Sequence, residues 1–528
     1  MRFVRKVIKM KNSCLFKTLA ILLFVCLLSP PCSWGQTDYR FQEDDLLKEM
    51  DKAAPKSSEQ KGQEDDLLKE MDKAGEAAPQ DQKGKEQVAQ AEAKRPTELS
   101  KLVDNFHGSL RLRGMHYWQN PPERDGADTR NDFGNALFKF SDKTGYKDFT
   151  LNVGGWVEYG NEENTYSGTS FSEFWQDMDR RRRILDISDL YINYSRETFN
   201  FLIGKKTLTN GMSTLYLPSD RMRPQDLNDP MDVKDLNLWQ ARMDYDVAEA
   251  TTLTAAFLPL YQPQKTPSET SRWMGERKKG DSTEFDLYDA GNANMKEDVP
   301  IFSDTNFGYF ARFKKKGFHG WDLFASFYHG PNPFYVVREE QVAGPIPGTT
   351  KPQRIKEVVK VDDYAAGFST TYESWEFHGE VVYNYSYDRK DDDYFNYVGG
   401  FTYTFDDFAK KLWLEKIEFT LEYANEIITR VQNAETYVSS SKQSRLGRND
   451  ILSRINFEYN NNLSFQFVCN FQVNQIDYGR FQRLEAKYKL RDGLITKLAG
   501  EFFGGQSDSL YGRWQKNDRL ILEFEYSF

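Results

Sequence analysis

The chain has 528 residues, a formal net charge of −10 and 15% aromatic residues, most of them Tyr and Phe. The acidic balance, without any basic face, argues against nucleic acid as a partner. Beyond the N-terminus, no stretch approaches the roughly 20 consecutive apolar residues that a membrane helix needs. Many aromatic residues without a long apolar run are typical of a membrane β-barrel, in which only every second residue of a strand faces lipid.

Residues 1–35 have the pattern of a secretory signal peptide. Basic residues precede a short apolar stretch at 18–28, and Ser33-Trp34-Gly35 fits a cleavage site between small residues. The apolar stretch is too short to cross a bilayer as a helix. Cleavage there would leave Cys469 as the only cysteine, so the exported protein would have no internal disulfide to stabilise it.

Residues 36–104 form a separate, highly charged segment in which the sequence QEDDLLKEMDKA occurs twice, at 42–53 and 63–74. In each copy the leucines and the methionine share one face of a short helix, with acidic residues toward its N-terminus and lysines toward its C-terminus. Such helices are marginal alone in water. We expect either a flexible periplasmic spacer, or short helices that dock on a periplasmic protein or form a weak coiled coil.

From residue 105 onward, apolar and polar side chains alternate along one segment after another. The last segment places charged residues such as Glu523 and Glu525 on one side and an apolar row on the other, namely Leu520, Leu522, Phe524, Tyr526 and Phe528. An earlier segment carries successive charges around Lys487 on one side, which would be severe in a dry core but cost little beside water. The pattern therefore favours a lipid-facing wall around an aqueous lumen over a packed sandwich.

The alternation predicts about eighteen strands. Their expected bounds are 106–118, 133–141, 148–159, 184–195, 199–207, 237–246, 250–259, 306–315, 319–330, 361–371, 375–387, 394–405, 412–427, 451–459, 463–476, 481–490, 493–505 and 518–528. Links after every second strand are short, whereas most of the alternate links are long. The two weaker strands, 133–141 and 237–246, leave a barrel of about sixteen strands as an alternative.

This alternation of links predicts an all-β fold over residues 105–528, a transmembrane antiparallel up-and-down β-barrel. The short links would face the periplasm, as would both ends of the chain. We expect the barrel to lie in the lipid of the outer membrane of a Gram-negative bacterium. The pattern does not specify an oligomeric state.

Two stretches resemble bacterial outer-membrane barrels. A terminal Phe528 after alternating apolar residues resembles the C-terminal strand that the assembly machinery of such barrels recognises. Residues 203–208 (IGKKTL), followed by Gly211, resemble a strand and turn of porin-like and alginate-export-type barrels, which have Gly-Arg-Gln and a later glycine there. In this chain Lys205-Lys206 replaces Arg-Gln. The resemblance implies a barrel of eighteen strands or a similar number, which passes small solutes or an anionic polysaccharide.

The link 208–236 is the candidate constriction, because it is the third long link and general porins fold a loop into the lumen there. Acids opposite bases at a waist set a size limit and a transverse field, which is how pores select solutes. A solvated surface loop is the alternative. The constriction candidates are Asp220, Arg221, Arg223, Asp226, Asp229 and Asp232. The pore-lining candidates on the strands are Arg111, Arg113, Arg312, Lys314, Arg454, Arg483, Glu485, Lys487 and Lys489.

Sequence motifs for haem attachment, for zinc binding in hydrolytic enzymes and for phosphate binding are missing from the sequence. We therefore expect no catalytic residues, no metal and no cofactor, and a porin-like channel for passive passage of small hydrophilic or charged solutes. One alternative is a polysaccharide-export barrel. The other is a plugged barrel or an enzyme that works with a periplasmic partner bound through residues 36–104.

Overall fold

The computed structural model describes residues 106–121, 128–161, 165–166, 171–179, 181–267, 271–275, 296–298, 306–344, 348–433, 435–437, 447–473, 479–507 and 509–528. The expected signal peptide and the duplicated segment at 36–104 lie outside these residues. No helix in the described part of the chain is long and apolar enough to cross a membrane.

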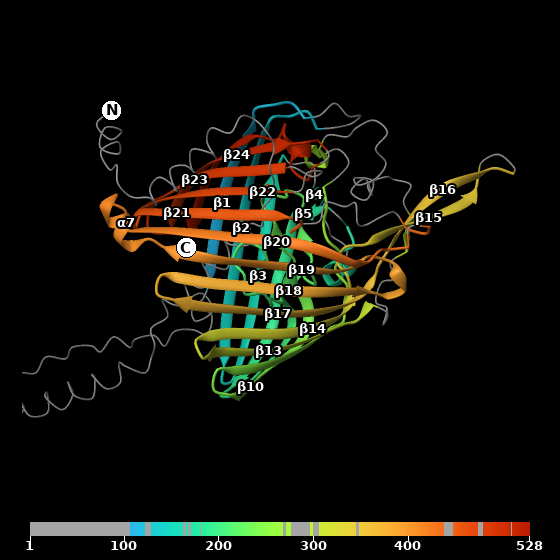
Figure 1. Ribbon diagram of the computed structural model, residues 1–528, viewed down its shortest axis with the longest axis horizontal. Coiled ribbons are helices and arrows are strands. Elements are labelled where there is room, and N and C mark those ends of the chain that lie inside the picture. The colour runs from blue at the N-terminus through green and yellow to red at the C-terminus, as the bar shows by residue number, and fades with distance from the viewer. Residues whose placement is uncertain are drawn as a thin grey trace, which may run out of the picture. The chain divides into compact units, whose positions relative to one another are not determined.

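Eighteen strands form one closed antiparallel sheet (Figure 1). They are β1 (His107–Tyr117), β2 (Asp132–Tyr146), β3 (Phe149–Gly160), β6 (Leu185–Arg196), β7 (Phe199–Lys206), β10 (Leu238–Ala248), β11 (Thr251–Leu258), β13 (Gly308–Phe318), β14 (Trp321–Pro331), β17 (Lys360–Tyr372), β18 (Trp375–Ser386), β19 (Asp393–Thr404), β20 (Lys416–Arg430), β21 (Asp450–Asn460), β22 (Leu463–Gln472), β23 (Gly479–Arg491), β24 (Leu494–Gly505) and β25 (Arg519–Ser527). Each strand pairs with the next along the chain, and β25 pairs with β1 to close the ring. The predicted fold class is confirmed, including the weaker strands now seen as β2 and β10.

Three predicted strand ends were wrong by four or five residues. The strand expected at 133–141 continues to Tyr146, and the one expected at 463–476 ends at Gln472. The third is the start of the strand expected at 412–427. The strand expected from residue 412 begins at Lys416, and the link before it contains a short helix, α7 (Asp406–Lys411). Asp406 and Asp407 lie in the first turn of this helix and Lys410 and Lys411 in its last turn. Charges of these signs at these ends are favourable to the helix dipole, so they stabilise a helix within the link 406–411 that the sequence predicts.

The links divide between the two ends of the barrel as the sequence predicts. At one end most links contain two residues, such as 147–148 and 197–198. At the other end they are longer and contain small elements of their own. These are β4 (Thr165–Tyr166), α6 (Phe171–Trp175), β5 (Arg182–Arg183), η1 (Pro218–Asp220), β8 (Gln225–Asp226), β9 (Lys234–Asp235), η2 (Arg272–Met274), β12 (Lys296–Asp298), β15 (Val336–Ala343), β16 (Thr350–Glu357), η5 (Tyr387–Arg389) and η7 (Gly512–Trp514). The hairpin β15–β16 projects beyond the barrel wall (Figure 1).

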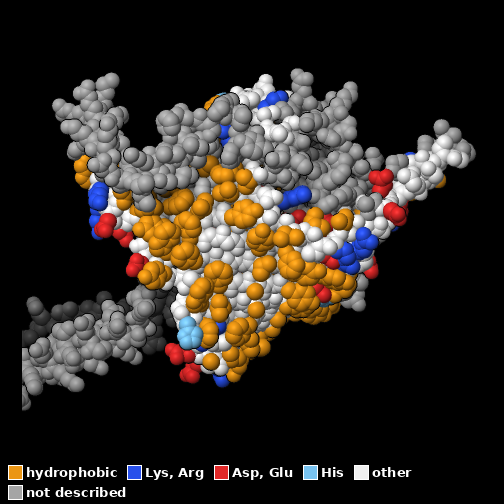
Figure 2. Space-filling model, in the orientation of Figure 1, with side chains coloured by type: hydrophobic (Ala, Val, Ile, Leu, Met, Phe, Trp, Pro, Cys, Tyr) orange, Lys and Arg blue, Asp and Glu red, His pale blue; other side chains and the backbone are white. Residues whose placement is uncertain are grey.

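The outer surface of the strands is apolar. Leu522 and Phe524 of β25 are 43% and 42% exposed, whereas Glu523 between them is 3% exposed. Figure 2 shows hydrophobic side chains over much of the strand surface on the face in view, with charged side chains gathered toward its ends. An apolar band around a closed sheet with charged residues on its inner side is the architecture of a transmembrane β-barrel.

The seam between β1 and β25 depends on Gly108. The backbone N–H of Gly108 donates to the carbonyl of Phe528, and the N–H of Phe528 donates to the carbonyl of Gly108, each at 2.8 Å. The Phe528 ring covers Gly108 so closely that an added Cβ would lie 2.6 Å from it, and the ring also stacks on Tyr526 with centroids 5.8 Å apart. The terminal aromatic residue identified in the sequence therefore packs at the site of closure.

Candidate pore constriction

The link 207–237 folds back into the barrel. It leaves β7 just after Gly204, which has a φ of +136° and lies so close to Leu190 that a Cβ there would be 2.1 Å from the Leu190 carbonyl oxygen. The side chain of Asn210 then donates to the Ser326 hydroxyl of β14 at 2.7 Å, and the Arg312 guanidinium of β13 donates to the Thr209 carbonyl at 2.9 Å. We call residues 207–237 the lumen loop.

Two carboxylates on the inner side of the wall hold the outward part of the lumen loop. Glu422 of β20 accepts the backbone N–H groups of Thr214, Leu215 and Tyr216 at 2.7, 2.8 and 2.9 Å. Glu380 of β18 accepts the Ser213 N–H at 3.3 Å and the Ser219 hydroxyl. Three consecutive N–H groups directed at one carboxylate form charge-assisted hydrogen bonds, which are stronger than neutral ones.

His378 and small apolar contacts complete this attachment. The Nε2 atom of His378, which is 1% exposed, lies 2.8 Å from Glu422. Leu215 and Tyr216 pack with residues of β19, β20 and β21, and Met212 packs against a cluster on β14, β17 and β18. The outward half of the lumen loop therefore follows the inner wall over several strands.

Three aspartates attach the returning part of the lumen loop, two of them to strands at the seam and one, Asp226, to β5 in the link between β3 and β6. Asp226 pairs with Arg182 at 2.5 Å, Asp229 with Arg519 at 2.6 Å, and Asp232 with Arg113 at 2.6 Å. Lys234 adds a contact to Glu158 of β3 at 3.2 Å. Because the loop is attached to β18 and β20 on one side and to β1, β3 and β25 on another, it crosses the interior of the barrel.

Neighbouring arginines keep Asp226 and Asp232 ionised. Burial by itself would raise the pKa of Asp226, but the charge and the hydrogen bond of Arg182 lower that pKa below its usual value. Burial opposes ionisation of Asp232 too, yet Arg113, Arg111 and Lys234 hold its pKa well below the usual range. Both carboxylates are therefore charged at neutral pH.

Of the other three predicted loop residues, Asp220 and Arg223 brace the loop from within, and Arg221 contacts β19 of the wall. Asp220 accepts the backbone N–H groups of Asn210 and Gly211 at 2.7 and 3.0 Å and pairs with Arg223 at 3.0 Å. Arg223 also pairs with Asp235 at 3.0 Å. The Arg221 guanidinium lies over the ring of Tyr394, 4.9 Å from its centroid.

The predicted wall residues lie on the inner rows of the strands, but they do not form one group. Arg111 and Arg113 lie beside Glu523 at the seam, at 3.9 and 2.8 Å. Arg483 pairs with Glu485 on the same strand and with Glu501 of β24.

The remaining predicted wall residues lie on other parts of the wall. Arg312 contacts the start of the lumen loop, as described above, and Lys314 lies two residues further along β13. Arg454 is buried on β21, Lys487 is half-buried on β23, and Lys489 pairs with Asp492 at the short-link end.

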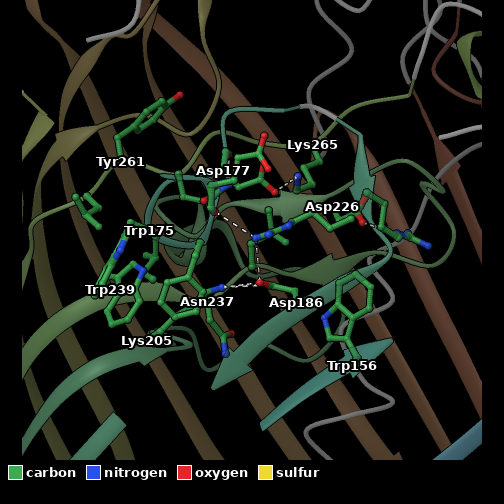
Figure 3. Close-up of a pocket in the computed structure, with 18 residues that line it drawn as sticks. Trp156, Trp175, Asp177, Asp186, Lys205, Asp226, Asn237, Trp239, Tyr261 and Lys265 are labelled. Carbon is green, nitrogen blue, oxygen red and sulfur yellow. Dashed lines mark hydrogen bonds and ion pairs between the residues drawn. The ribbon is translucent and has the colours of Figure 1, made fainter. Parts of the chain in front are cut away.

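A second region of contact lies where the lumen loop meets two other long links (Figure 3). Asp177 pairs with Lys265 at 2.7 Å, and the Lys265 ammonium also donates to the carbonyls of Asp179 and Arg181. Nearby, Trp175 and Trp239 lie with ring centroids 4.5 Å apart. The cavity between these groups measures about 30 Å³, which is room for about one water molecule. We interpret this cluster as a clamp that holds the links together.

Sequence reasoning missed several residues that hold the lumen loop, chiefly Arg182, Glu422 and Arg519. The signal for Arg519 was present, since it lies on the same side of its strand as Glu523 and Glu525, with Ile521 between it and Glu523. The inner position of Glu422 also followed from the alternation of its strand. Their partners did not, because Arg519 and Asp229 are 290 residues apart in the sequence.

No protein-family model matches the sequence, and no curated protein sequence matches it at a significant level. The chain is similar in structure to OccK11 (OpdR) of Pseudomonas aeruginosa, at 10% identity and a TM-score of 0.42, with 81% of this chain and 96% of that chain covered. It is also similar to OmpF of Salmonella typhi, solved in complex with daunomycin, at 8% identity and a TM-score of 0.37, with 80% of this chain and 97% of that chain covered. A mutant porin of Rh. blastica is similar at 8% identity and a TM-score of 0.36, with 80% of this chain and 99% of that chain covered. The fold assignment rests on the strand pairing described above, which is that of a closed, porin-like, eighteen-stranded barrel.

Proposed function

We propose that the protein is an outer-membrane channel for passive passage of small hydrophilic or charged solutes, in which the lumen loop narrows the aqueous path. The observation that carries the proposal is the attachment of this loop to opposite parts of the inner wall, through Glu380 and Glu422 on one side and Arg113 and Arg519 on the other. A loop held at both ends of its crossing gives a fixed waist, and charged groups at a waist select solutes by size and sign.

The orientation follows from the links. In transmembrane barrels of bacteria the short turns face the periplasm and the long loops face the outside. We infer that the short links here are periplasmic, which would place the N-terminal segment 36–104 in the periplasm of a Gram-negative bacterium.

Planar-bilayer recording of the full chain tests the proposal. We expect stepwise conductance, and we expect Asp226→Asn and Asp229→Asn to shift the reversal potential in a KCl gradient toward anion selectivity. Each substitution removes one of the carboxylates that pair with an arginine, so that Arg182 keeps Glu158 and Arg519 keeps Glu501. Removing one partner of a buried ion pair costs about 3–5 kcal/mol, so heat-modifiable migration on gels would first establish that each variant still folds. Asp407→Asn, which makes the same change of charge on exposed α7, is the matched control.

The absence of conductance steps would overturn the channel. If both variants conduct with the reversal potential of the wild type, the lumen loop does not form the constriction that selects ions. A panel of sugars, sugar acids and small ions would then define the solute class.

A plugged barrel that works with a partner is the second candidate. The extent of packing inside the mouth favours it: Trp273, from the link between β11 and β13, is buried against Trp514 and Phe503, and Arg272 lies 3.5 Å from the centroid of the Tyr117 ring. Such a barrel would fold and insert but carry no current.

A further inference from the structure

Most basic side chains inside the barrel have a carboxylate partner. Arg113, Arg182 and Arg519 pair with the lumen loop or the seam, as described above. Arg483 pairs with Glu501 at 3.3 Å, and Lys497 pairs with Glu523 at 3.0 Å. These charges are therefore neutralised locally and offer little to a passing solute.

The inner wall formed by β7, β10 and β13 differs. Lys206, Arg242 and Arg312 lie on its inner rows, since they alternate with lipid-facing side chains on the same strands, namely Ile203, Met243 and Phe313, which are 54%, 40% and 43% exposed. The charge of Arg242 acts on both Lys206 and Arg312, and that of Lys143 on β2 acts on Lys206. These four residues form what we call the basic patch.

Two members of the basic patch lack a carboxylate partner within the described part of the chain. The Lys206 ammonium lies over the Tyr191 ring, 4.5 Å from its centroid, and makes no hydrogen bond or ion pair with any described residue. The Arg312 guanidinium donates only to the Thr209 carbonyl, and its Nε is buried without a hydrogen-bond acceptor. A buried donor without a hydrogen-bond partner destabilises the protein, so a ligand that supplies an acceptor would remove this penalty and bind more tightly.

The acidic residues near the patch are already engaged. Asp244 accepts from Arg242 at 3.0 Å and from the Thr254 hydroxyl at 2.6 Å. Asp189 accepts from Ser188 and from Asn237, at 3.2 and 3.1 Å. Asp220 of the lumen loop, whose charge also acts on Arg312, pairs with Arg223 at 3.0 Å. The four cations of the patch therefore face three carboxylates, which leaves a net charge of about +1 at neutral pH.

We propose that the basic patch is a binding site for a small oxyanion, a carboxylate or phosphate group, beneath the start of the lumen loop. Arg312 and Arg242 would present planar donor forks to the anion, and Lys206 would add a mobile point charge. Because the patch lies on the lumen wall and its side chains are only partly buried, an ion in the lumen reaches it. This inference rests on the proposed channel function and names the solute class as anionic.

Equilibrium binding to the purified full chain in detergent tests the site without requiring current. Isothermal titration calorimetry with sodium succinate and with sodium phosphate should show saturable binding, and glucose should show none. In the double variant Lys206→Gln/Arg312→Gln the patch loses both unpartnered cations, and affinity should fall about tenfold or more, since charge-assisted hydrogen bonds are lost. Lys411→Gln, at the end of exposed α7, removes one charge outside the lumen and should leave affinity unchanged.

The two probes distinguish the source of the oxyanion, a carboxylate solute or a phosphate. No binding of either by the wild type, or equal affinity in the double variant, would overturn the site. Binding without any conductance would support the site and overturn the channel, whereas conductance without binding would do the reverse.

Discussion

Carboxylates of the wall and of the loop do most of the positioning inside this barrel. Glu422, which is completely buried, is held by three backbone N–H groups and lies beside His378, and Asp229 is held by Arg519. The sequence predicted Asp229 as a lumen residue because acids and bases cluster in its link. It could not predict which charges meet, because the ring of strands brings together residues hundreds of positions apart.

Asp518 provides a prediction on pH. It lies just before β25, where burial raises the pKa of its carboxyl to about 6, although the Phe503 N–H, at 2.7 Å, and Arg480 oppose this rise. A carboxyl with a folded pKa above its unfolded value of 3.8 binds its proton more tightly in the folded state. Ionisation of Asp518 therefore destabilises the fold progressively as the pH rises from about 4 to about 6, and to a constant extent above that.

We expect Asp518→Asn to unfold at a higher temperature than the wild type at pH 8, because the Asn side-chain oxygen still accepts from Phe503 and carries no charge. The difference should shrink as the pH falls and disappear below about pH 4, where the Asp518 carboxyl is protonated in both the folded and the unfolded protein. Thermal melts in detergent at pH 8 and below about pH 4 measure this difference in unfolding temperature. A difference of the same size at both would contradict the assignment.

At the level of elements, the two glycines of the lumen-loop motif have separate roles. Gly204 bends the end of β7, and Gly211 lets the loop approach Glu380, since an added Cβ would lie 3.0 Å from a Glu380 carboxylate oxygen and 2.2 Å from Leu217. The sequence identified this stretch only by its resemblance to other barrels. The physical reason for a glycine at position 211 becomes clear only in the structure, where the loop passes close to Glu380 of β18. The sequence placed residues 406–411 in a link without predicting that they form α7, and it began the next strand four residues too early.

Gly211→Ala should loosen the outward half of the lumen loop. The methyl group would displace the backbone from Glu380, and losing a hydrogen bond costs about 0.5–1.5 kcal/mol. We expect larger and noisier single-channel conductance with unchanged expression and folding. Gly399→Ala on β19, where an added Cβ meets no atom within 4 Å, is the control and should conduct as the wild type does. Identical traces for the two variants would argue against this role for Gly211.

For the whole molecule, the order and number of strands could be predicted because lipid on one side and water on the other impose a period of two on every strand. The alternation of short and long links added which connections gather at each end of the barrel. The interior could not be predicted in the same way, because the packing of long links depends on contacts between distant strands and not on a local period.

Deletion of residues 36–104 should leave conductance largely intact, because every strand of the closed sheet lies after residue 106. Bilayer recordings of the deletion variant measure this. Loss of current in a variant that still inserts would indicate that the charged segment takes part in the channel, as the alternative of a partner-dependent barrel requires.

The pairing of β1 with β25 has a consequence for biogenesis. Until these two strands meet, each presents a row of bare amide and carbonyl groups, and hydrocarbon offers them nothing to bond with. A partly assembled wall cannot rest in the bilayer as a stable intermediate. Insertion into the membrane and pairing of the first and last strands must therefore occur together, or another protein must cover the unpaired strand edges until the barrel closes.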